Sequence, residues 1–209
     1  MTVPTIVLAS ASPRRKQLLE MLRIPVLVHP ANVQEFALPG EAPAAYSRRL
    51  ARDKARAVPG ELVLGADTIV VLDDRILEKP ADDGQALEML RALQGRTHTV
   101  ITAVCLVAHG VERHAIDETA VTFRRCSDEF LRDYIATGEP HDKAGAYGIQ
   151  GWGAALVERI DGDFFGVMGL PLRLVLNLLA DAGHEYRFQT RNSEQVRSKQ
   201  VGRTSGSGS

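Results

Sequence analysis

The feature that most constrains this sequence is an aspartate inside a continuous apolar run. Residues 62–72 read LVLGADTIVVL, with Gly60 before them and the turn pair Asp73 and Asp74 after them. An apolar run bounded by turn residues predicts a buried β-strand. Because an ionised carboxylate is costly there unless a cation or donor meets it, we expect Asp67 to face a cleft that holds cations. The simpler alternative is an aspartate at a strand end, hydrogen-bonded to a neighbouring loop.

Length and composition indicate an ordinary globular protein. The 209 residues are 44% hydrophobic and 24% charged, and the net charge of −1 gives no general attraction to nucleic acid or acidic membranes. No run approaches the roughly 18 apolar residues of a membrane span, and no signal-peptide pattern follows Met1. We therefore expect a cytoplasmic protein without nucleic-acid or membrane partners. Cys105 and Cys126 lack metal-ligand spacing and are expected to be buried free thiols.

A basic helix start near the N-terminus suggests an anion site. A short strand over 6–9 leads into residues 10–15 (SASPRR), where Ser12 is a suitable N-cap and Pro13 a suitable first helical residue. First helical turns usually carry acidic residues, but Arg14 and Arg15 place cations beside exposed backbone N–H groups. A bound phosphate would explain this arrangement, in which Ser10 and Ser12 belong to the same turn. A solvated basic turn is the alternative.

Two lysines are candidates for the same cleft. Lys54 lies near the core-facing side of a helix expected over 44–57, where its side chain could either extend to water or point into the cleft. A second short strand over 76–80 forms a predicted hairpin with the run around Asp67. Because Lys79 precedes Pro80, its backbone is restricted to an extended conformation. The hairpin would bring it back toward the level of Asp67.

The second half of the chain alternates strands and helices. A lone His98 at a strand entrance is more often structural than catalytic. Residues 141–153 contain four glycines, typical of a loop whose backbone approaches a ligand, and Gln150 offers both a donor and an acceptor, as needed to read a nucleobase edge. Strands are expected over 96–107, 112–126 and 155–160, helices over 83–93, 128–136 and 171–179, a return toward the cleft or core over 164–169, and a disordered polar tail over 191–209.

The chemistry available is that of phosphate groups. The sequence contains no Walker-type loop, dinucleotide-binding glycine motif, HExxH zinc motif or nucleophile elbow. It offers cations at a helix start, fixed lysines, and the carboxylates Asp67 and Glu35. Carboxylates hold Mg²⁺ together with phosphate oxygens, and cations offset phosphate charge. This set suits attack of an activated water on a phosphoanhydride.

Five segments together resemble the Maf family of nucleotide pyrophosphatases. They occur in the family's order and cover the chain from about residue 6 to residue 179. The segments are 10–15 (SASPRR), 65–70 (GADTIV), 78–80 (EKP), 95–98 (GRTH) and 142–151 (DKAGAYGIQG). The branch that hydrolyses dTTP and UTP to the monophosphate and pyrophosphate is the most similar, because Arg14, Thr68 and Gln150 match the positions linked to base selection there.

The resemblance implies a fold, a site and an assembly. The fold would be α/β, with a twisted mixed central sheet flanked by helices, two lobes with the active-site cleft between them, and one catalytic domain over 1–190. Asp67 would activate water, Glu35 and Asp67 would hold Mg²⁺ or Mn²⁺, and the protein would usually be a homodimer. Gln34 precedes Glu35 where the family often has an acidic pair. The predicted substrate-binding residues are Ser10, Ser12, Arg14, Arg15, Lys54, Thr68, Lys79 and Gln150.

Two other functions remain open at this point. The sister specificity of the family is hydrolysis of 7-methyl-GTP, which would contradict the assignment of Gln150 to a pyrimidine. A non-catalytic nucleotide-binding regulator of cell division is the alternative from another class. A protein that only binds would not need the carboxylate of Asp67 beside its phosphate cations, because without a metal that charge weakens anion binding.

Overall fold

The structure, a computed structural model, describes residues 3–188 and contains in that range one seven-stranded mixed sheet. The order is β2-β1-β3-β5-β6-β7, and β4 also pairs with β3. β1 runs parallel to β2 and β3, and the other pairs are antiparallel. This confirms the predicted α/β fold with a mixed central sheet. The strands are β1 Ile6–Leu8, β2 Val26–Val28, β3 Leu62–Leu72, β4 Arg75–Leu77, β5 Thr97–Ala108, β6 Val111–Phe123 and β7 Val157–Asp161.

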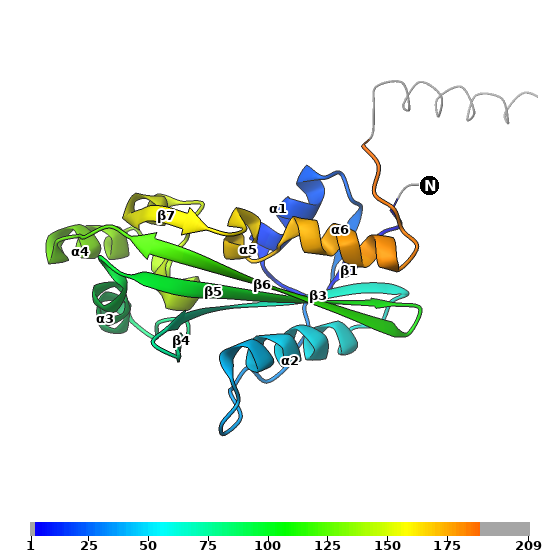
Figure 1. Cartoon of the computed structure of the whole chain (residues 1–209), viewed down its shortest axis with the longest axis horizontal. Coiled ribbons are helices and arrows are strands. Elements are labelled where there is room, and N and C mark those ends of the chain that lie inside the picture. Colours follow the sequence, from blue (N-terminus) through cyan, green and yellow to red (C-terminus); the bar gives the residue numbers. More distant parts are fainter. Residues whose placement is uncertain (1–2, 189–209) are drawn as a thin grey trace, which may run out of the picture.

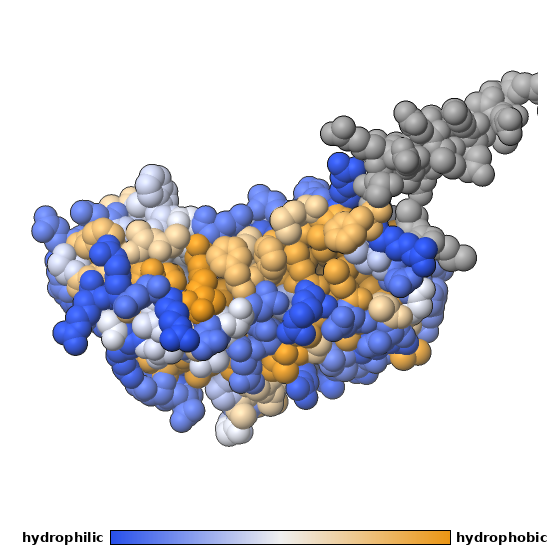
Figure 2. Space-filling view, turned by 45° about the horizontal axis from the view of Figure 1, so that its top comes forward, coloured by the Kyte–Doolittle hydropathy of each residue, from blue (hydrophilic) through white to orange (hydrophobic). Residues whose placement is uncertain are grey.

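Helices cover both faces of the sheet (Figure 1). α2 lies along one face, α1, α5 and α6 lie on the other, and α3 and α4 lie near the far end of the long strands. Figure 2 brings the side of α5 and α6 forward and shows hydrophobic residues running across it between hydrophilic ones. The helices are α1 Pro13–Met21, α2 Pro43–Arg56, α3 Asp83–Leu93, α4 Asp128–Ala136, α5 Phe164–Met168 and α6 Leu172–Asp181, with short 3₁₀ helices at Glu139–Asp142, Ala144–Ala146 and Trp152–Leu156. No helix within residues 3–188 is long and apolar enough to cross a membrane.

Alternation along β3 divides the core in two. Leu64 and Val70 belong to the large apolar cluster on the side of α1 and α6, whereas Val63 and Ile69 pack on the side of α2. Side chains of successive strand residues point to opposite faces. Asp67 therefore lies on the α2 side of the sheet, and its neighbour Thr68 on the other.

One edge of β3 is paired at its two ends and open between them. β1 pairs with Val63 and Leu64, and β4 pairs with residues from Val70 to Leu72. In the described part of the chain, residues 65–69 have no strand partner on that edge, and we call this segment the edge gap. Groups from both faces of the sheet can meet a ligand at such a gap, so Asp67 and Thr68 can belong to one site.

α2 approaches β3 closely at Gly65. A Cβ atom placed there would lie 2.2 Å from the carbonyl oxygen of Ala51, which is far below van der Waals contact. The absence of a side chain at Gly65 thus lets α2 pass directly against the strand. It places Lys54, one turn beyond Ala51, over the edge gap.

The predicted helix starts are confirmed with one difference. Ser12 occupies the N-cap position and Pro13 begins the helix, but the Ser12 side chain makes no capping hydrogen bond. Asp82 and Ser127 do cap their helices, accepting from the N–H groups of Gln85 and Phe130. Ser12 thus leaves the helix N-terminus uncapped by its side chain, as an anion site would require.

Several sequence expectations need correction. Cys105 is buried as predicted, but Cys126 follows β6 instead of lying in it and is partly exposed. The expected return over 164–169 is confirmed, since Met168 and Gly169 line the cavity, but it takes the form of the short helix α5, Phe164–Met168. Strand β7 begins at Val157 because a 3₁₀ turn occupies the residues before it. Strand β2 was not predicted, and the tail over 191–209 lies outside the described residues.

Candidate active site

A cavity of about 630 Å³ opens at the edge gap. Its walls come from the turn before α1, from α2, from β3, from the segment after β4 and from the loop after α4. Every site residue predicted from the sequence lies on its lining. These residues are Ser10, Ser12, Arg14, Arg15, Glu35, Lys54, Asp67, Thr68, Lys79 and Gln150.

Asp67 is buried, at 5% exposure, and only one of its carboxylate oxygens is satisfied. Oδ1 accepts a hydrogen bond of 2.8 Å from Lys54 Nζ. Oδ2 is buried and has no hydrogen-bond partner among the described residues. The strand is held in place by the Ser47 hydroxyl, which donates to the backbone carbonyl of Asp67 over 3.2 Å. A buried unpartnered carboxylate oxygen is costly, and a bound ligand would relieve that cost.

Lys54 joins Asp67 to Glu35. Its Nζ lies 2.8 Å from Glu35 Oε1 and 2.8 Å from Asp67 Oδ1, and the lysine side chain is almost wholly buried. Of the two directions the sequence allowed for Lys54, the structure shows the one into the cavity. Burial raises the pKa of Glu35, but the hydrogen bond and charge of Lys54 outweigh it, so this pKa lies below its ordinary value. Glu35 is thereby kept ionised at the mouth of the cavity.

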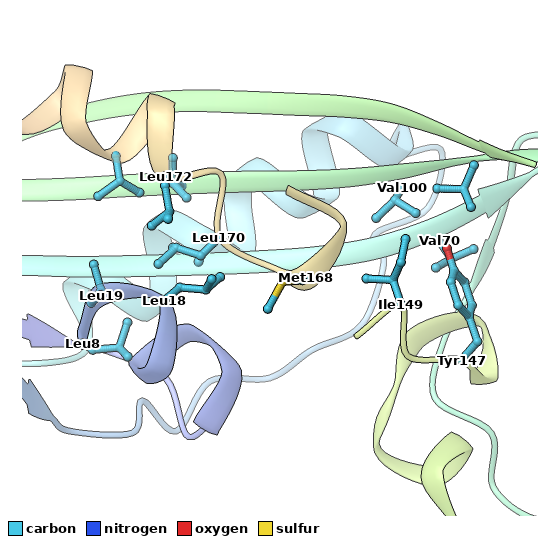
Figure 3. Close-up of a cluster of buried hydrophobic side chains, with 14 of the residues drawn as sticks. Leu8, Leu18, Leu19, Val70, Val100, Tyr147, Ile149, Met168, Leu170 and Leu172 are labelled. Atoms are coloured by element: carbon cyan, nitrogen blue, oxygen red, sulfur yellow. The ribbon is translucent and has the colours of Figure 1, made fainter. Parts of the chain in front are cut away.

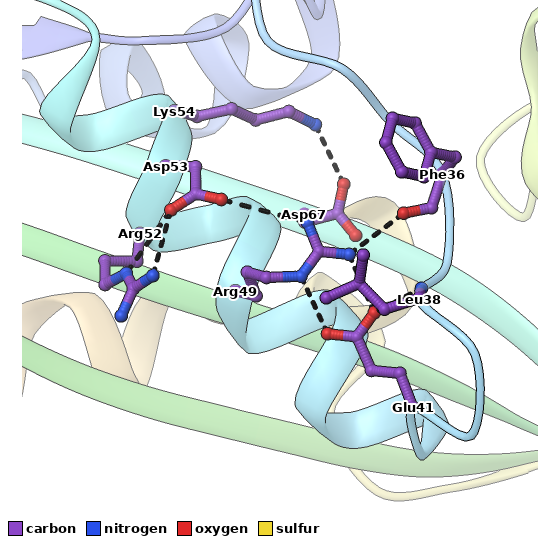
Figure 4. Close-up of polar contacts among 8 residues, drawn as sticks. All are labelled: Phe36, Leu38, Glu41, Arg49, Arg52, Asp53, Lys54 and Asp67. Atoms are coloured by element: carbon purple, nitrogen blue, oxygen red, sulfur yellow. Dashed lines mark hydrogen bonds and ion pairs between the residues drawn. The ribbon is translucent and has the colours of Figure 1, made fainter.

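The loop that carries Glu35 is fastened to α2 by Arg49, a contact that sequence reasoning missed. Arg49 Nε and Nη2 each donate to the Glu41 carboxylate over 2.7 Å, and Nη2 also donates to the Phe36 carbonyl over 2.9 Å (Figure 4). Glu41 in turn accepts from the Leu38 N–H. The hydrogen bonds from Arg49 lower the pKa of Glu41 to about 2. In the sequence, the only sign of this contact was that a helix with several arginines follows a loop that contains a glutamate.

On the opposite face, Arg15 is held by three protein acceptors. Its Nε donates to the Gly169 carbonyl over 2.8 Å, Nη1 to Ser10 Oγ over 2.9 Å, and Nη2 to Thr68 Oγ1 over 3.1 Å. Burial lowers the pKa of Arg15, with the charge of Asp67 opposing that shift. A guanidinium has five N–H donors, so two remain for a ligand. Arg15 is therefore both fixed and still able to bind an anion.

The remaining predicted residues lie nearer the rim. Arg14 is part-exposed and lies 3.6 Å from the Asp142 carboxylate. Lys79 and Gln150 are exposed. The pairing of Val70 with Leu77 carries Lys79 to about the level of Thr68, as the hairpin predicted.

One part of the cavity lining is an apolar wall. It consists of Val70 on β3, Val100 on β5, Met168 of α5 and Ile149 of the glycine-rich loop (Figure 3). Thr68 lies at the junction of this wall with Arg15. The cavity therefore has a cationic part and an apolar part, which suits a ligand that joins a charged group to a flat ring.

Glu139 organises the glycine-rich loop and was not identified from the sequence. Its Oε1 accepts from Tyr134 and from the Gly153 N–H, and its Oε2 accepts from the Trp152 N–H over 2.8 Å. A Cβ atom at Gly151 would lie 1.9 Å from Glu139 Oε2. The glycine at this position is thus required by the carboxylate that folds the loop around Gln150.

His98 is structural, as the sequence favoured. It is buried, its Nε2 pairs with the Tyr147 hydroxyl at 2.8 Å, and its ring packs edge-on against Phe123 and Tyr147. Burial lowers its pKa to about 4. It does not line the cavity.

The protein groups available to a divalent cation are carboxylates. No cluster of three or more His, Cys, Asp or Glu side chains suited to a metal occurs within residues 3–188. Asp67 and Glu35 supply hard oxygen donors, and the unpartnered Oδ2 of Asp67 is free to bind. A Mg²⁺ ion commonly takes one or two carboxylates and completes its shell with phosphate oxygens and water. The residues present fit such an ion.

Several known proteins are similar to this chain. A protein named dTTP/UTP pyrophosphatase from Koribacter versatilis is 52% identical over 182 residues, covering 85% of this chain and 94% of that protein. Proteins of the same name from Anaeromyxobacter dehalogenans and Exiguobacterium sibiricum are 52% and 48% identical, covering 86% and 88% of this chain and 95% of each relative. Among solved structures, the Ham1 protein of Staphylococcus aureus is 12% identical with a TM-score of 0.42, over 57% of this chain and 71% of that chain.

A sequence model described as Maf-like protein matches residues 5–182. That range contains the edge gap, both lysines and the loop around Gln150. The chain belongs to the Maf family.

Proposed function

We propose that this chain is a nucleoside triphosphate pyrophosphatase that hydrolyses dTTP and UTP, and modified pyrimidine nucleotides, to the monophosphate and pyrophosphate. Such an activity removes unwanted nucleotides from the precursor pool. The observation that carries the proposal is Asp67, a buried carboxylate with one oxygen on Lys54 and the other unpartnered, at the centre of a cation-lined cavity. Relatives about 50% identical over most of the chain are named dTTP/UTP pyrophosphatase.

The triphosphate would bind at the turn before α1. Arg14, Arg15 and Lys79 supply positive charge there, and Ser10 and Ser12 line the same part of the cavity. The backbone N–H groups at the start of a helix favour an anion. Because Arg15 is already held by protein acceptors, it loses little conformational entropy when it binds phosphate.

Asp67 would accept the proton of the attacking water. Water attacks the α-phosphorus, and the bond from that phosphorus to the oxygen that bridges to the β-phosphate breaks. The products are the monophosphate and pyrophosphate. The free Oδ2 of Asp67 can take the proton, and Lys54 holds the other oxygen so that the carboxylate cannot rotate away. Lys54 also offsets the negative charge that would otherwise oppose phosphate binding.

A divalent cation, Mg²⁺ or Mn²⁺, would be held by Asp67 and Glu35. When bound, such an ion neutralises phosphate charge and makes a coordinated water more acidic. The ionised state of Glu35, maintained by Lys54, leaves its carboxylate available for that role.

The base would occupy the apolar part of the cavity. Val70, Val100 and Ile149 form an apolar wall for a flat ring, and Gln150 lies at its rim. Thr68, which accepts from Arg15, and Arg14 line the same cavity. A pyrimidine carries donors and acceptors on one edge, which these polar groups could read.

Other properties stay predictions from the sequence. They are a homodimer, a cytoplasmic location, the absence of nucleic-acid and membrane partners, a single catalytic domain over 1–190, and two lobes with a cleft between them. Gel filtration with light scattering of the full chain would test the homodimer.

The proposed function is tested by product analysis on a nucleotide panel. The purified chain with Mg²⁺ or Mn²⁺ is expected to release pyrophosphate from dTTP and UTP, faster than from CTP or 7-methyl-GTP. Release of single phosphate would contradict the bond assignment. Preference for the methylated purine would instead identify the sister specificity, and binding without turnover would favour the regulator.

A further inference from the structure

One carboxylate of the cavity lining lies between two cations. Asp142 Oδ1 lies 2.6 Å from Lys143 Nζ, and Asp142 Oδ2 lies 3.6 Å from Arg14 Nη1. All three residues line the cavity. Arg14 belongs to the first turn of α1, whereas Asp142 and Lys143 lie at the end of the 3₁₀ helix Glu139–Asp142. The carboxylate therefore joins two walls of the cavity, with one oxygen toward each cation.

Lys143 is held in place by the protein. Its side chain is only 13% exposed, and Nζ donates over 2.6 Å to the backbone carbonyl of Glu139 as well as to Asp142. The stem of the side chain packs against Gly148, where an added Cβ atom would lie 2.7 Å from Lys143 Cε. An ammonium group has three N–H donors, so one remains for a ligand. Lys143 is therefore fixed and still able to bind an anion, as Arg15 is.

Asp142 is the most exposed of the three side chains, at 64% against 28% for Arg14. Burial raises the pKa of Asp142, but the hydrogen bond and charge of Lys143, together with the charge of Arg14, outweigh it, so this pKa lies below its ordinary value. The carboxylate is therefore ionised at neutral pH. Because exposed ion pairs contribute little to stability, little is lost when this side chain turns into solvent.

A phosphate group would satisfy the two cations better than the carboxylate does. It offers more oxygen atoms and, within a polyphosphate, more negative charge. Guanidinium and ammonium groups bind phosphate oxygens through charge-assisted hydrogen bonds, and the start of α1 beside Arg14 also favours an anion. The position between Arg14 and Lys143 thus has the chemistry of a phosphate subsite, and Asp142 fills it with a weaker anion.

We propose that Arg14 and Lys143 form a phosphate subsite of the nucleotide site and that Asp142 competes with the substrate for it. This inference rests on the proposed function for the identity of the ligand, since the phosphate belongs to a nucleoside triphosphate. Lys143 is then a substrate-binding residue, whereas Asp142 weakens phosphate binding. The two neighbouring residues have opposite effects on affinity.

The test compares variants that keep the shapes of these two side chains. Lys143→Met keeps the stem against Gly148 without the charge, and Asp142→Asn removes the competing charge. With the full chain and Mg²⁺, we expect KM for dTTP to rise about tenfold in Lys143→Met and to fall about threefold in Asp142→Asn, with kcat changed less than about twofold. The opposite signs are decisive, because damage to the loop would raise KM in both variants.

An exposed ion pair outside the cavity supplies matched controls. Lys16 and Glu20 of α1 lie 3.4 Å apart, are about half exposed and do not line the cavity. Lys16→Met and Glu20→Gln make the same changes of charge, and each is expected to leave KM for dTTP nearly unchanged. Equal shifts in these controls would show that the total charge of the protein sets KM, which would overturn the subsite.

Binding of inorganic triphosphate to the full chain, measured by calorimetry, needs neither a base nor cleavage. It should weaken in Lys143→Met and tighten in Asp142→Asn. If the unchanged chain releases pyrophosphate from neither dTTP nor UTP, the proposed function fails and this titration alone decides the subsite. If dTTP is hydrolysed but both variants keep the KM and the triphosphate affinity of the unchanged chain, the proposed function stands and the subsite is wrong.

The competition has its own contrary result. A higher or unchanged KM in Asp142→Asn would mean that Asp142 holds the two cations for the substrate instead of competing with it. Thermal unfolding is measured for each variant, and Lys143→Gln repeats the comparison if the methionine variant does not fold.

Discussion

The two faces of β3 at the edge gap carry different chemical groups, which are mostly ionic on one face and mostly neutral on the other. On the α2 side, which we call the acid face, Asp67, Lys54 and Glu35 form a linked ionic group. On the other side, the hydroxyl face, the hydroxyl groups of Thr68 and of Thr102 on β5 form a neutral row that ends on one buried arginine. Asp67 and Thr68 are consecutive residues, so the alternation of a strand separates two environments that open into one cavity.

The pKa shifts follow the same division. On the hydroxyl face, burial lowers the pKa of His98 to about 4, lowers that of Arg15 and raises that of Asp117, each toward the neutral form. On the acid face, Lys54 outweighs burial and keeps Glu35 ionised. The carboxylates of Asp67 and Glu35, with the lysine that pairs with them, thus lie on one face, while the other face holds hydroxyl groups around a single buried arginine.

Replacing Asp67 should remove the chemistry of the acid face. We expect Asp67→Asn to lower kcat for dTTP about thousandfold, the size of a lost general base, because an amide cannot accept the proton of water. KM should change only a few-fold, since the phosphate cations remain. Steady-state kinetics and nucleotide binding by calorimetry measure the two quantities. Turnover close to that of the unchanged chain would exclude Asp67 as the proton acceptor.

Replacing Lys54 should leave negative charge on the acid face without a compensating cation. Lys54→Met leaves the buried Asp67 carboxylate without its cation, and we expect the free energy of unfolding to fall by about 3 kcal/mol. Denaturant unfolding at neutral pH measures it. The double variant with Asp67→Asn should recover part of the loss, because no uncompensated charge is left. Additive losses would mean that the two side chains are not coupled.

Acid should destabilise the hydroxyl face through His98. The unfolded chain takes up a proton near the ordinary pKa of 6.5, whereas the folded chain does so only near 4. Above about pH 6.5, protonation of His98 therefore takes nothing from the free energy of unfolding. As the pH drops toward 4, this group lowers the free energy of unfolding by about 3 kcal/mol. Denaturant unfolding at a series of pH values measures the decline. A His98→Asn variant, which has no titrating ring, should show a flatter profile over this interval.

Loosening the glycine-rich loop should have the smallest effect. Glu139→Gln replaces one acceptor oxygen by an NH2 group, which cannot accept from the N–H group of Trp152 or Gly153. We expect KM for dTTP to rise about fivefold at nearly constant kcat, the size of one lost hydrogen bond that positions substrate. Gln150→Ala serves as the matched variant for the same loop. A fall in kcat with unchanged KM would place Glu139 closer to the chemistry than its contacts indicate.

The sequence was informative wherever the signal was local. Asp67 in its apolar run, the hairpin that returns Lys79 and the helix start at Ser12 all follow from neighbouring residues, and each is found where it was predicted. The direction of Lys54 could not be decided, because it depends on how α2 packs against β3. The contacts of Thr102 gave no signal at all, since they come from pairing with Thr68 and from the carbonyl of a helix residue 64 positions away.

The contact at Gly65 also sets how the catalytic group can be adjusted. With no room for even a methyl group between Ala51 and the strand, the separation of α2 from β3 is a fixed dimension of the molecule. Lys54 is carried on that helix, so its reach to Asp67 is determined by a position that meets no substrate. An added side chain at residue 65 would push α2 away from the strand and draw the Lys54 ammonium away from the Asp67 carboxylate. This glycine therefore affects the reactivity of Asp67 without contacting the substrate.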